Sequence, residues 1–166
     1  MIPLAVTGYE LSLFVHITAV MVGFGATFAE SVMFPVALKM NARHLPYVHR
    51  LQLTINKHFA LPALVLVLGT GIYQVLDTSA FDFGQLWIDG TLGIVVVLAV
   101  LLLAFFIPSD KKLLPMIEGE IAAAGEGEVT PSEEYQREAR KQAIVGPVTG
   151  LLLVAAVYLM VTKPGL

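Results

Sequence analysis

Residues 11–38 read LSLFVHITAVMVGFGATFAESVMFPVAL, and this stretch decides the fold. Its only ionisable side chains are His16 and Glu30. A helix of about 20 mostly apolar residues is long enough to cross the hydrocarbon core of a bilayer. The stretch therefore predicts a membrane-spanning helix with two ionisable groups at depths where such groups are costly.

Three further stretches have the same apolar character, namely residues 57–76, 86–107 and 143–161. Of all residues in the chain, 57% are hydrophobic and only 14% are charged. A soluble domain of this size cannot bury so much apolar surface. We therefore predict an all-α fold, in which residues 1–166 form a single membrane domain, a polytopic bundle of four transmembrane helices.

The basic residues are concentrated in two of the three connections between spans. Every lysine and arginine except Lys163 lies within or next to residues 39–56 and 108–142. Connections rich in lysine and arginine stay on the cytoplasmic side of a membrane. The sequence thus predicts a multi-pass protein of the plasma (inner) membrane, with both termini outside and the loops 39–56 and 108–142 cytoplasmic.

The longer of these connections, residues 108–142, contains two helical patterns. One continues the third span past the membrane, with a bend or break expected at Pro108 and Pro115. The other begins at Thr130, where a capping threonine is followed three residues later by Glu133. We expect the two helices to project into the cytoplasm as a hairpin.

The connection between the first two spans also has helical periodicity. Apolar side chains recur at helical spacing from residue 45 onwards, which predicts that the second helix begins near Pro46. Pro62 lies inside this helix and is expected to kink it, because proline removes a backbone hydrogen bond. His44 and His49 belong to the basic part, and we expect both to be solvated or interfacial.

In the first span, His16, Gly23 and Glu30 are spaced by seven residues and fall on one face of a helix, drifting by about 20° per step. We call this face the seam; its other members are Ala19, Val20, Ala26 and Thr27. The opposite face is formed by Leu13, Val15, Ile17, Val22, Phe24 and Phe28. Polar groups in a span face the bundle or water, and small residues let helices approach closely, so the seam is expected to face inward.

Glu30 and His16 belong to different depths, because the helical rise separates them by roughly 21 Å. The second span runs in the opposite direction and brings Lys57 and His58 to about the depth of Glu30. We expect Glu30 to pair with one of them. Such a pair is either a structural contact between two helices or a proton or cation site that opens to the cytoplasm.

His16 lies nearer the outer side, close to the head of the third span. Asp89 is the natural carboxylate there to orient a histidine ring. Two interpretations stay open: a histidine that hydrogen-bonds a tyrosine or glutamine near the interface, or a ligand of haem or a metal, since neutral imidazole is the commonest metal ligand.

Several motifs carry a resemblance to a known group of proteins. They are LFVHITAVMVGFGATF (residues 13–28), RLQLTINKHFALPALVLVLGTGIY (50–73), QLWIDGTLG (85–93) and YLMVTKPG (158–165). Together they resemble small four-helix bacterial integral membrane proteins of unknown function, broadly similar to HemJ-like protoporphyrinogen oxidases and CopD-like copper-resistance proteins. The resemblance implies a first-span histidine that binds haem b or handles a metal, and only His16 matches it. The haem-linked relatives carry a lysine or histidine where this chain has Asp89.

The sequence leaves three functions open, and with them the question of whether the protein is an enzyme. The first is a redox role with haem b or a metal bound by His16 and oriented by Asp89. The second is a proton- or ion-coupled transporter that uses Glu30 with Lys57 or His58. The third is a structural or assembly subunit of a membrane complex.

The expected partners follow from the same composition. They are the lipid bilayer and a second membrane protein or a second copy of the chain. Nucleic acid is not expected as a partner, because the chain has no basic binding surface. Thiol chemistry is excluded because there is no cysteine.

Overall fold

The computed structural model describes residues 6–165, and the elements in this range are all helical. Its α-helices are α1 (Gly8–Ala37), α2 (Leu45–Ile55), α3 (Leu61–Asp77), α4 (Leu86–Val100), α5 (Ile107–Ala124) and α6 (Glu133–Thr162). A short 3₁₀ turn, η1 (Ala42–His44), precedes α2. Two π-helical segments, η2 (Asn56–Ala60) and η3 (Leu101–Phe106), join α2 to α3 and α4 to α5.

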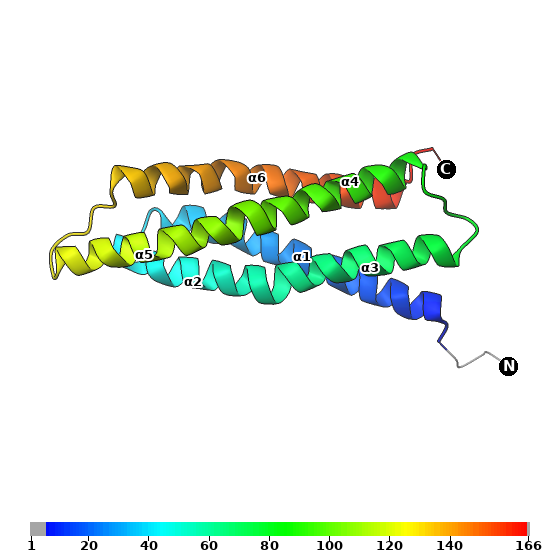
Figure 1. Ribbon diagram of the computed structural model, residues 1–166, viewed down its shortest axis with the longest axis horizontal. Coiled ribbons are helices and arrows are strands. Elements are labelled where there is room, and N and C mark those ends of the chain that lie inside the picture. Colours follow the sequence, from blue (N-terminus) through cyan, green and yellow to red (C-terminus); the bar gives the residue numbers. More distant parts are fainter. Residues whose placement is uncertain (1–5, 166) are drawn as a thin grey trace.

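The π segments merge their neighbours, so the chain forms four long helices that lie side by side (Figure 1). The first is α1, the second α2–η2–α3, the third α4–η3–α5 and the fourth α6. All four are long and apolar enough to cross a membrane. The all-α, four-helix membrane bundle is therefore confirmed for residues 6–165, while residues 1–5 and 166 of the predicted domain lie outside the described range.

The helices alternate in direction along the chain. In Figure 1, α1 begins and α6 ends at the right-hand end, whereas the connection between α5 and α6 lies at the left-hand end. We call the left-hand end the loop end. The strongest helix pairings are α1 with α3, α4 with α6 and α2 with α5. Which end faces the cytoplasm stays a prediction from the charge distribution.

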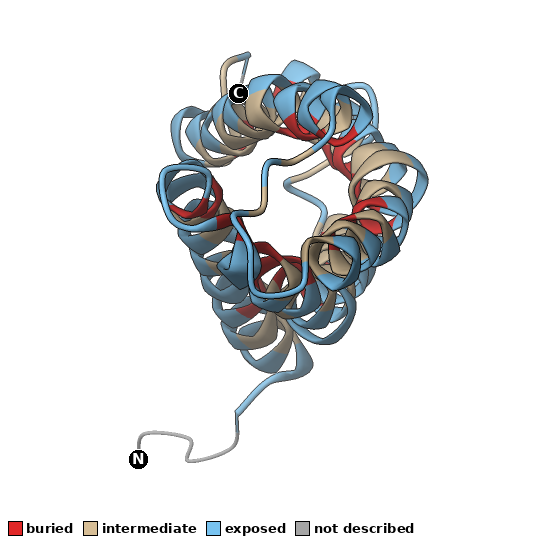
Figure 2. Ribbon diagram, turned by 90° about the vertical axis from the view of Figure 1, so that its left-hand side faces the viewer, coloured by how far each residue is buried: buried red, intermediate tan, exposed pale blue. Residues whose placement is uncertain are grey.

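The loop end contains the most completely buried side chains of the described residues, among them Leu113, Ile117 and Tyr135 at 0–1% exposure. This loop-end core is formed by Phe34, Ala37, Ala42, Leu45, Val48, Leu113, Ile117, Tyr135 and Ala139. Figure 2, seen from the loop end, shows buried residues on the inner faces of the ring of helices and exposed residues outside. Here α5 and the start of α6 pack against α2 and the end of α1, and the projection of residues 108–142 into the cytoplasm stays a prediction.

The start of α6 differs from the prediction. Ser132, not Thr130, caps the helix by accepting a hydrogen bond from the backbone N–H of Tyr135 at 3.2 Å. Glu120 of α5 accepts hydrogen bonds from the hydroxyl and the backbone N–H of Ser132, at 2.5 and 3.1 Å. This contact with a neighbouring helix selects the serine as the cap, a choice that local sequence rules do not reveal.

The prolines of the second and third long helices do not break them. Pro62 and Pro108 each lie in the first turn of the α-helix that follows a π segment. Proline lacks an N–H and its ring clashes with the preceding turn, and the wider π turn accommodates both. The chain remains helical through Pro115 to Ala124, so the expected break at Pro108 or Pro115 is absent.

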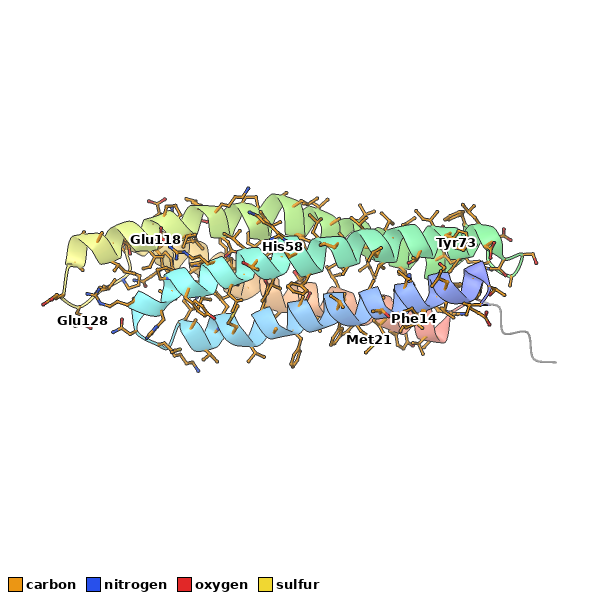
Figure 3. The ribbon with its side chains drawn as sticks, turned by 90° about the horizontal axis from the view of Figure 1, so that it is seen from below. Phe14, Met21, His58, Tyr73, Glu118 and Glu128 are labelled. Atoms are coloured by element: carbon orange, nitrogen blue, oxygen red, sulfur yellow. The ribbon has the colours of Figure 1, made fainter. Side chains whose placement is uncertain are left out.

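The first helix is oriented as the seam predicts. Ala19 is 4% exposed, and a Cβ atom on Gly23 would lie 3.6 Å from the Ala63 Cβ on α3. On the other face, Phe14 and Met21 are more than 65% exposed, as lipid-facing side chains would be (Figure 3). The inward orientation of the seam is thus confirmed.

Candidate functional site

A cavity of about 140 Å³ lies inside the bundle, between the loop-end core and the more apolar part of the four helices. We call it the central cavity. Its polar lining consists of Thr27, Glu30, Ser31, Gln52, Asn56, Gln142 and Thr149. A cavity needs only about 10–15 Å³ to hold one water molecule. The central cavity therefore has room for several waters or a hydrated ion, and it is smaller than the sites that bind drug-sized ligands.

Each of the four long helices is irregular where it meets this cavity. Pro35 of α1 and Pro147 of α6 line it, as do residues of both π segments. π turns inside α-helices are frequent at functional sites. A proline or a π segment from each of the four long helices thus lies at the central cavity. Regular α-helical geometry is interrupted in all four helices at this level of the bundle.

The two prolines also change the polarity of the lining. A proline cannot donate to the carbonyl four residues earlier, so the carbonyl groups of Ser31 and Ala143 lose their regular helical partner. Both residues line the central cavity. Each proline therefore leaves one backbone carbonyl without its regular helical donor, in a residue that lines the central cavity.

Four side chains of the lining have a buried polar atom without a protein hydrogen-bond partner. These atoms are Glu30 Oε1, Gln52 Oε1, Asn56 Nδ2 and Gln142 Oε1. The three amide residues are 3–5% exposed. An unsatisfied buried polar group costs about 1–3 kcal/mol, so such groups normally face water or an ion. The cavity is consequently suited to hold water, which can donate to the three oxygens and accept from Asn56 Nδ2, or a small cation beside the oxygens.

Glu30 lies at the depth that the antiparallel arrangement predicts, but it faces a different residue of the second helix. Asn56 lines the cavity with Glu30, whereas Lys57 and His58 are exposed; Figure 3 labels His58 on the second long helix. Successive residues of a helix are rotated by roughly 100°, so the neighbours of an inward residue point away. Among residues 6–165, none of the ion pairs includes Glu30, and the expected pairing with Lys57 or His58 is wrong.

A second polar cluster lies beside the cavity, within the loop-end core. Asp110 Oδ1 accepts hydrogen bonds from His49 Nδ1 and from Gln142 Nε2, both at 2.9 Å. His49 Nε2 lies 2.8 Å from the Tyr135 hydroxyl. Both His49 and Asp110 are 0% exposed. The expectation of a solvated or interfacial His49 is wrong, while His44 is exposed as expected.

The sequence did contain a signal for this cluster. His49, Gln52 and Asn56 are spaced by three and four residues, so they share one helix face with the buried Leu45. A polar stripe on the apolar face of a helix indicates a buried network. The prediction for this segment rested on its apolar periodicity and its basic charge, and it therefore placed His49 in a solvated or interfacial position.

Gln142 joins the cluster to the central cavity. Its Nε2 atom binds Asp110, while its Oε1 atom is unpartnered and the residue lines the cavity. Asp110 Oδ2 is likewise buried without a protein partner. The two polar regions are therefore in contact through one amide side chain.

At the opposite end of the seam, His16 Nδ1 lies 2.9 Å from Thr70 Oγ1. The Thr70 hydroxyl donates its single hydrogen to the Leu66 carbonyl at 2.5 Å. His16 Nδ1 must therefore be the donor to Thr70, and this leaves a lone pair on Nε2. Thr70 takes the orienting role that was expected of Asp89, which is exposed and accepts from the Gly84 N–H at 3.3 Å.

His16 lines an outer cavity of about 100 Å³ together with Gln74 and Trp87. The rest of the lining is apolar, and His16 is its only imidazole. Within residues 6–165 there is no group of three His, Asp or Glu side chains that could hold a metal ion. A haem or a metal here would depend on a single protein imidazole.

Comparison with known proteins gives one match. The family model described as "Predicted integral membrane protein (DUF2269)" matches residues 10–164. No curated protein and no solved structure matches the chain. The family match supports a location in the lipid bilayer, and it does not support the resemblance to HemJ-like or CopD-like proteins.

Proposed function

Because the chain belongs to the DUF2269 family of predicted integral membrane proteins, we propose that it is a proton-coupled membrane transport protein. In this proposal Glu30 binds and releases the proton. The observation that carries it is the carboxyl group of Glu30, which faces the central cavity without a cationic partner among the described residues.

The physical argument concerns the charge of this carboxyl group. A buried carboxylate is strongly unfavourable unless it is paired, bound to a cation or neutralised by a proton. The amide side chains of Gln52, Asn56 and Gln142 offer polar atoms but no charge. Neutralisation must therefore come from a mobile species, and the cavity has the size for water, a proton or a small cation.

A transport role also needs a route through the bundle, and the cavities form a row. A loop-end cavity of about 490 Å³ shares Ala143 with the central cavity. The central cavity shares Val67 and Val95 with the outer cavity that holds His16. Glu30 is thus placed between two further spaces, one toward each end, with a pair of valines as the apolar constriction on the outer side.

The experiment is a proton-flux assay in proteoliposomes. The purified protein is reconstituted with a pH-sensitive dye inside, and a potassium diffusion potential drives proton entry. We expect dye acidification with the wild type and a loss of at least about tenfold in rate with Glu30→Gln. The matched control is Glu126→Gln, which removes an exposed acid of the α5–α6 connection. Equal flux in the wild type and Glu30→Gln would refute the proposal, and flux that requires sodium would assign the site to a metal cation.

A second candidate function is haem b binding at His16, with a redox role. It is supported by the lone pair on His16 Nε2, since a ligating histidine commonly fixes its other ring nitrogen by a hydrogen bond, here to Thr70. The visible spectrum of the purified, haem-supplemented protein tests it. A Soret band that disappears in His16→Ala supports the candidate, and the absence of a band in the wild type rejects it.

The proposal also includes the orientation of the protein in the membrane. We place the protein in the plasma (inner) membrane with the loop end in the cytoplasm, on the basis of the lysine and arginine distribution. The loop-end cavity then opens on the cytoplasmic side.

A further inference from the structure

Three buried side chains form an unbroken hydrogen-bonded chain at the loop end. The Tyr135 hydroxyl lies 2.8 Å from His49 Nε2, and His49 Nδ1 lies 2.9 Å from Asp110 Oδ1. None of the three residues is more than 1% exposed. They come from α6, α2 and α5, so the chain of hydrogen bonds crosses the core from helix to helix.

The two ends of this chain lie at different cavities. Tyr135 lines the loop-end cavity. At the other end Asp110 is bound by Gln142, a lining residue of the central cavity, and Asp110 Oδ2 is buried without a protein partner. A hydrogen-bonded chain that begins at one cavity and ends beside another is the arrangement that proton transfer requires.

We propose that Tyr135, His49 and Asp110 form the path by which protons pass between the loop-end cavity and Glu30. This inference rests on the proposed function of Glu30 and adds the route and its residues. The ionisable groups that surround the histidine ring are Asp110 from α5 and Tyr135 from α6, and Glu30 from α1 lies in the adjoining central cavity.

The proposed proton transfer breaks and forms only O–H and N–H bonds. The Tyr135 hydroxyl gives its proton to His49 Nε2 and takes another from water in the loop-end cavity. The ring then gives the proton on Nδ1 to the Asp110 carboxylate. One proton has moved across the ring, which now carries its hydrogen on Nε2; exchange with a water molecule, which gives a proton to Nδ1 and takes the one on Nε2, restores the starting tautomer.

The last step delivers the proton to the central cavity. Asp110 becomes neutral when it accepts the proton, and it returns to the carboxylate when it passes that proton through water to Glu30. No oxidant or reductant takes part. Histidine suits the middle position because its two nitrogens can accept and donate at opposite edges of one ring.

A buried histidine–aspartate pair can also be purely structural, so the test measures two properties separately. The first is the infrared C=O stretch of protonated Glu30, identified by its loss in Glu30→Gln. The second is proton flux in proteoliposomes. Tyr135→Phe removes one oxygen atom and keeps the ring in the core, and His49→Gln removes the titrating ring and keeps hydrogen-bonding capacity. Thermal unfolding followed by circular dichroism checks that each variant is folded.

We expect both variants to retain the Glu30 band and to lower the flux by at least about tenfold. Flux within about twofold of the wild type in a folded Tyr135→Phe protein, with the band intact, overturns the path and leaves the proposed function standing. If the His49→Gln protein does not fold, the proton flux of the Tyr135→Phe protein alone tests the proposed path. If the wild type itself lacks a Glu30 band and a proton flux, the proposed function fails instead, so the two failures are distinguishable.

Discussion

His49 Nδ1 donates to Asp110 Oδ1 at 2.9 Å, and both side chains are completely buried although each comes from a polar part of the sequence. The pair joins α2 to α5 inside the loop-end core. Gln142 adds a third helix to the same carboxylate. Residues 39–56 and 108–142, which the sequence predicts to be connections between spans, are therefore held together by a specific polar contact.

Removal of the carboxylate should destabilise the fold. Asp110→Ala leaves the buried donors of His49 and Gln142 without an acceptor, and losing one partner of a buried pair typically costs about 3–5 kcal/mol. We expect the free energy of unfolding in detergent, measured by circular dichroism during denaturation, to fall by about this amount.

The control is an exposed ion pair between the same two helices. Arg50 and Glu118 approach to 2.5 Å, with side chains 68% and 39% exposed. Glu118→Ala should change the free energy of unfolding by less than about 1 kcal/mol, because exposed pairs contribute little. Equal effects of Asp110→Ala and Glu118→Ala would contradict the structural role of the buried pair.

The contact between α1 and α3 predicts that substitutions at two nearby glycines of α3 change the free energy of unfolding by different amounts. A Cβ atom on Gly71 would lie 3.4 Å from His16 Cε1, whereas one on Gly69 would have nothing within 4 Å. Overfilling a packed interface costs about 1–3 kcal/mol. Gly71→Leu should therefore lower the free energy of unfolding by this amount, and Gly69→Leu should leave it nearly unchanged. A larger loss for Gly69→Leu would show that the helix pairing is wrong.

The valine constriction predicts a gain in flux. Val67 and Val95 line both the central and the outer cavity, so the double variant Val67→Ala/Val95→Ala should widen the passage between them. We expect a several-fold faster proton flux in proteoliposomes. The control is Val65→Ala/Val96→Ala, which truncates valines that are 62% and 52% exposed. If both double variants behave alike, the row of cavities is not the route.

The orientation can be measured without removing any native thiol, because the chain contains no cysteine. Single cysteines at Ser79, between α3 and α4, and at Glu126, between α5 and α6, lie at opposite ends of the bundle. We expect a membrane-impermeant maleimide to label Ser79→Cys in intact cells. Glu126→Cys should react only after the membrane is permeabilised, and the reverse pattern would invert the predicted topology.

The sequence predicted the helices well because apolar length is a strong signal. It also predicted which face of α1 turns inward, since small and polar residues repeat along 30 residues of helix. It predicted the level of Glu30 in the bundle as well, because antiparallel helices place residues at matching depths.

It did not predict which residue of the second helix meets Glu30, although Asn56 follows His49 and Gln52 at helical spacing. The basic side chains of the next two residues favoured an ion pair with Glu30, and this pairing directed the prediction to the wrong face. Asn56 opens the π segment η2 and faces the cavity, while Lys57 and His58 do not. The partners of His49 could not be predicted, because Asp110 and Tyr135 lie 61 and 86 residues away along the chain.

The position of Glu30 near one end of the span also has an electrical consequence. A proton that reaches Glu30 from the loop end crosses the smaller part of the apolar thickness, whereas the remaining distance toward His16 is roughly 21 Å of about 30 Å of hydrocarbon. Moving one elementary charge through the full potential changes its energy by about 2.3 kcal/mol per 100 mV. The voltage dependence of transport should therefore arise mainly in the step past Val67 and Val95, and loading of Glu30 from the loop end should depend less on membrane potential.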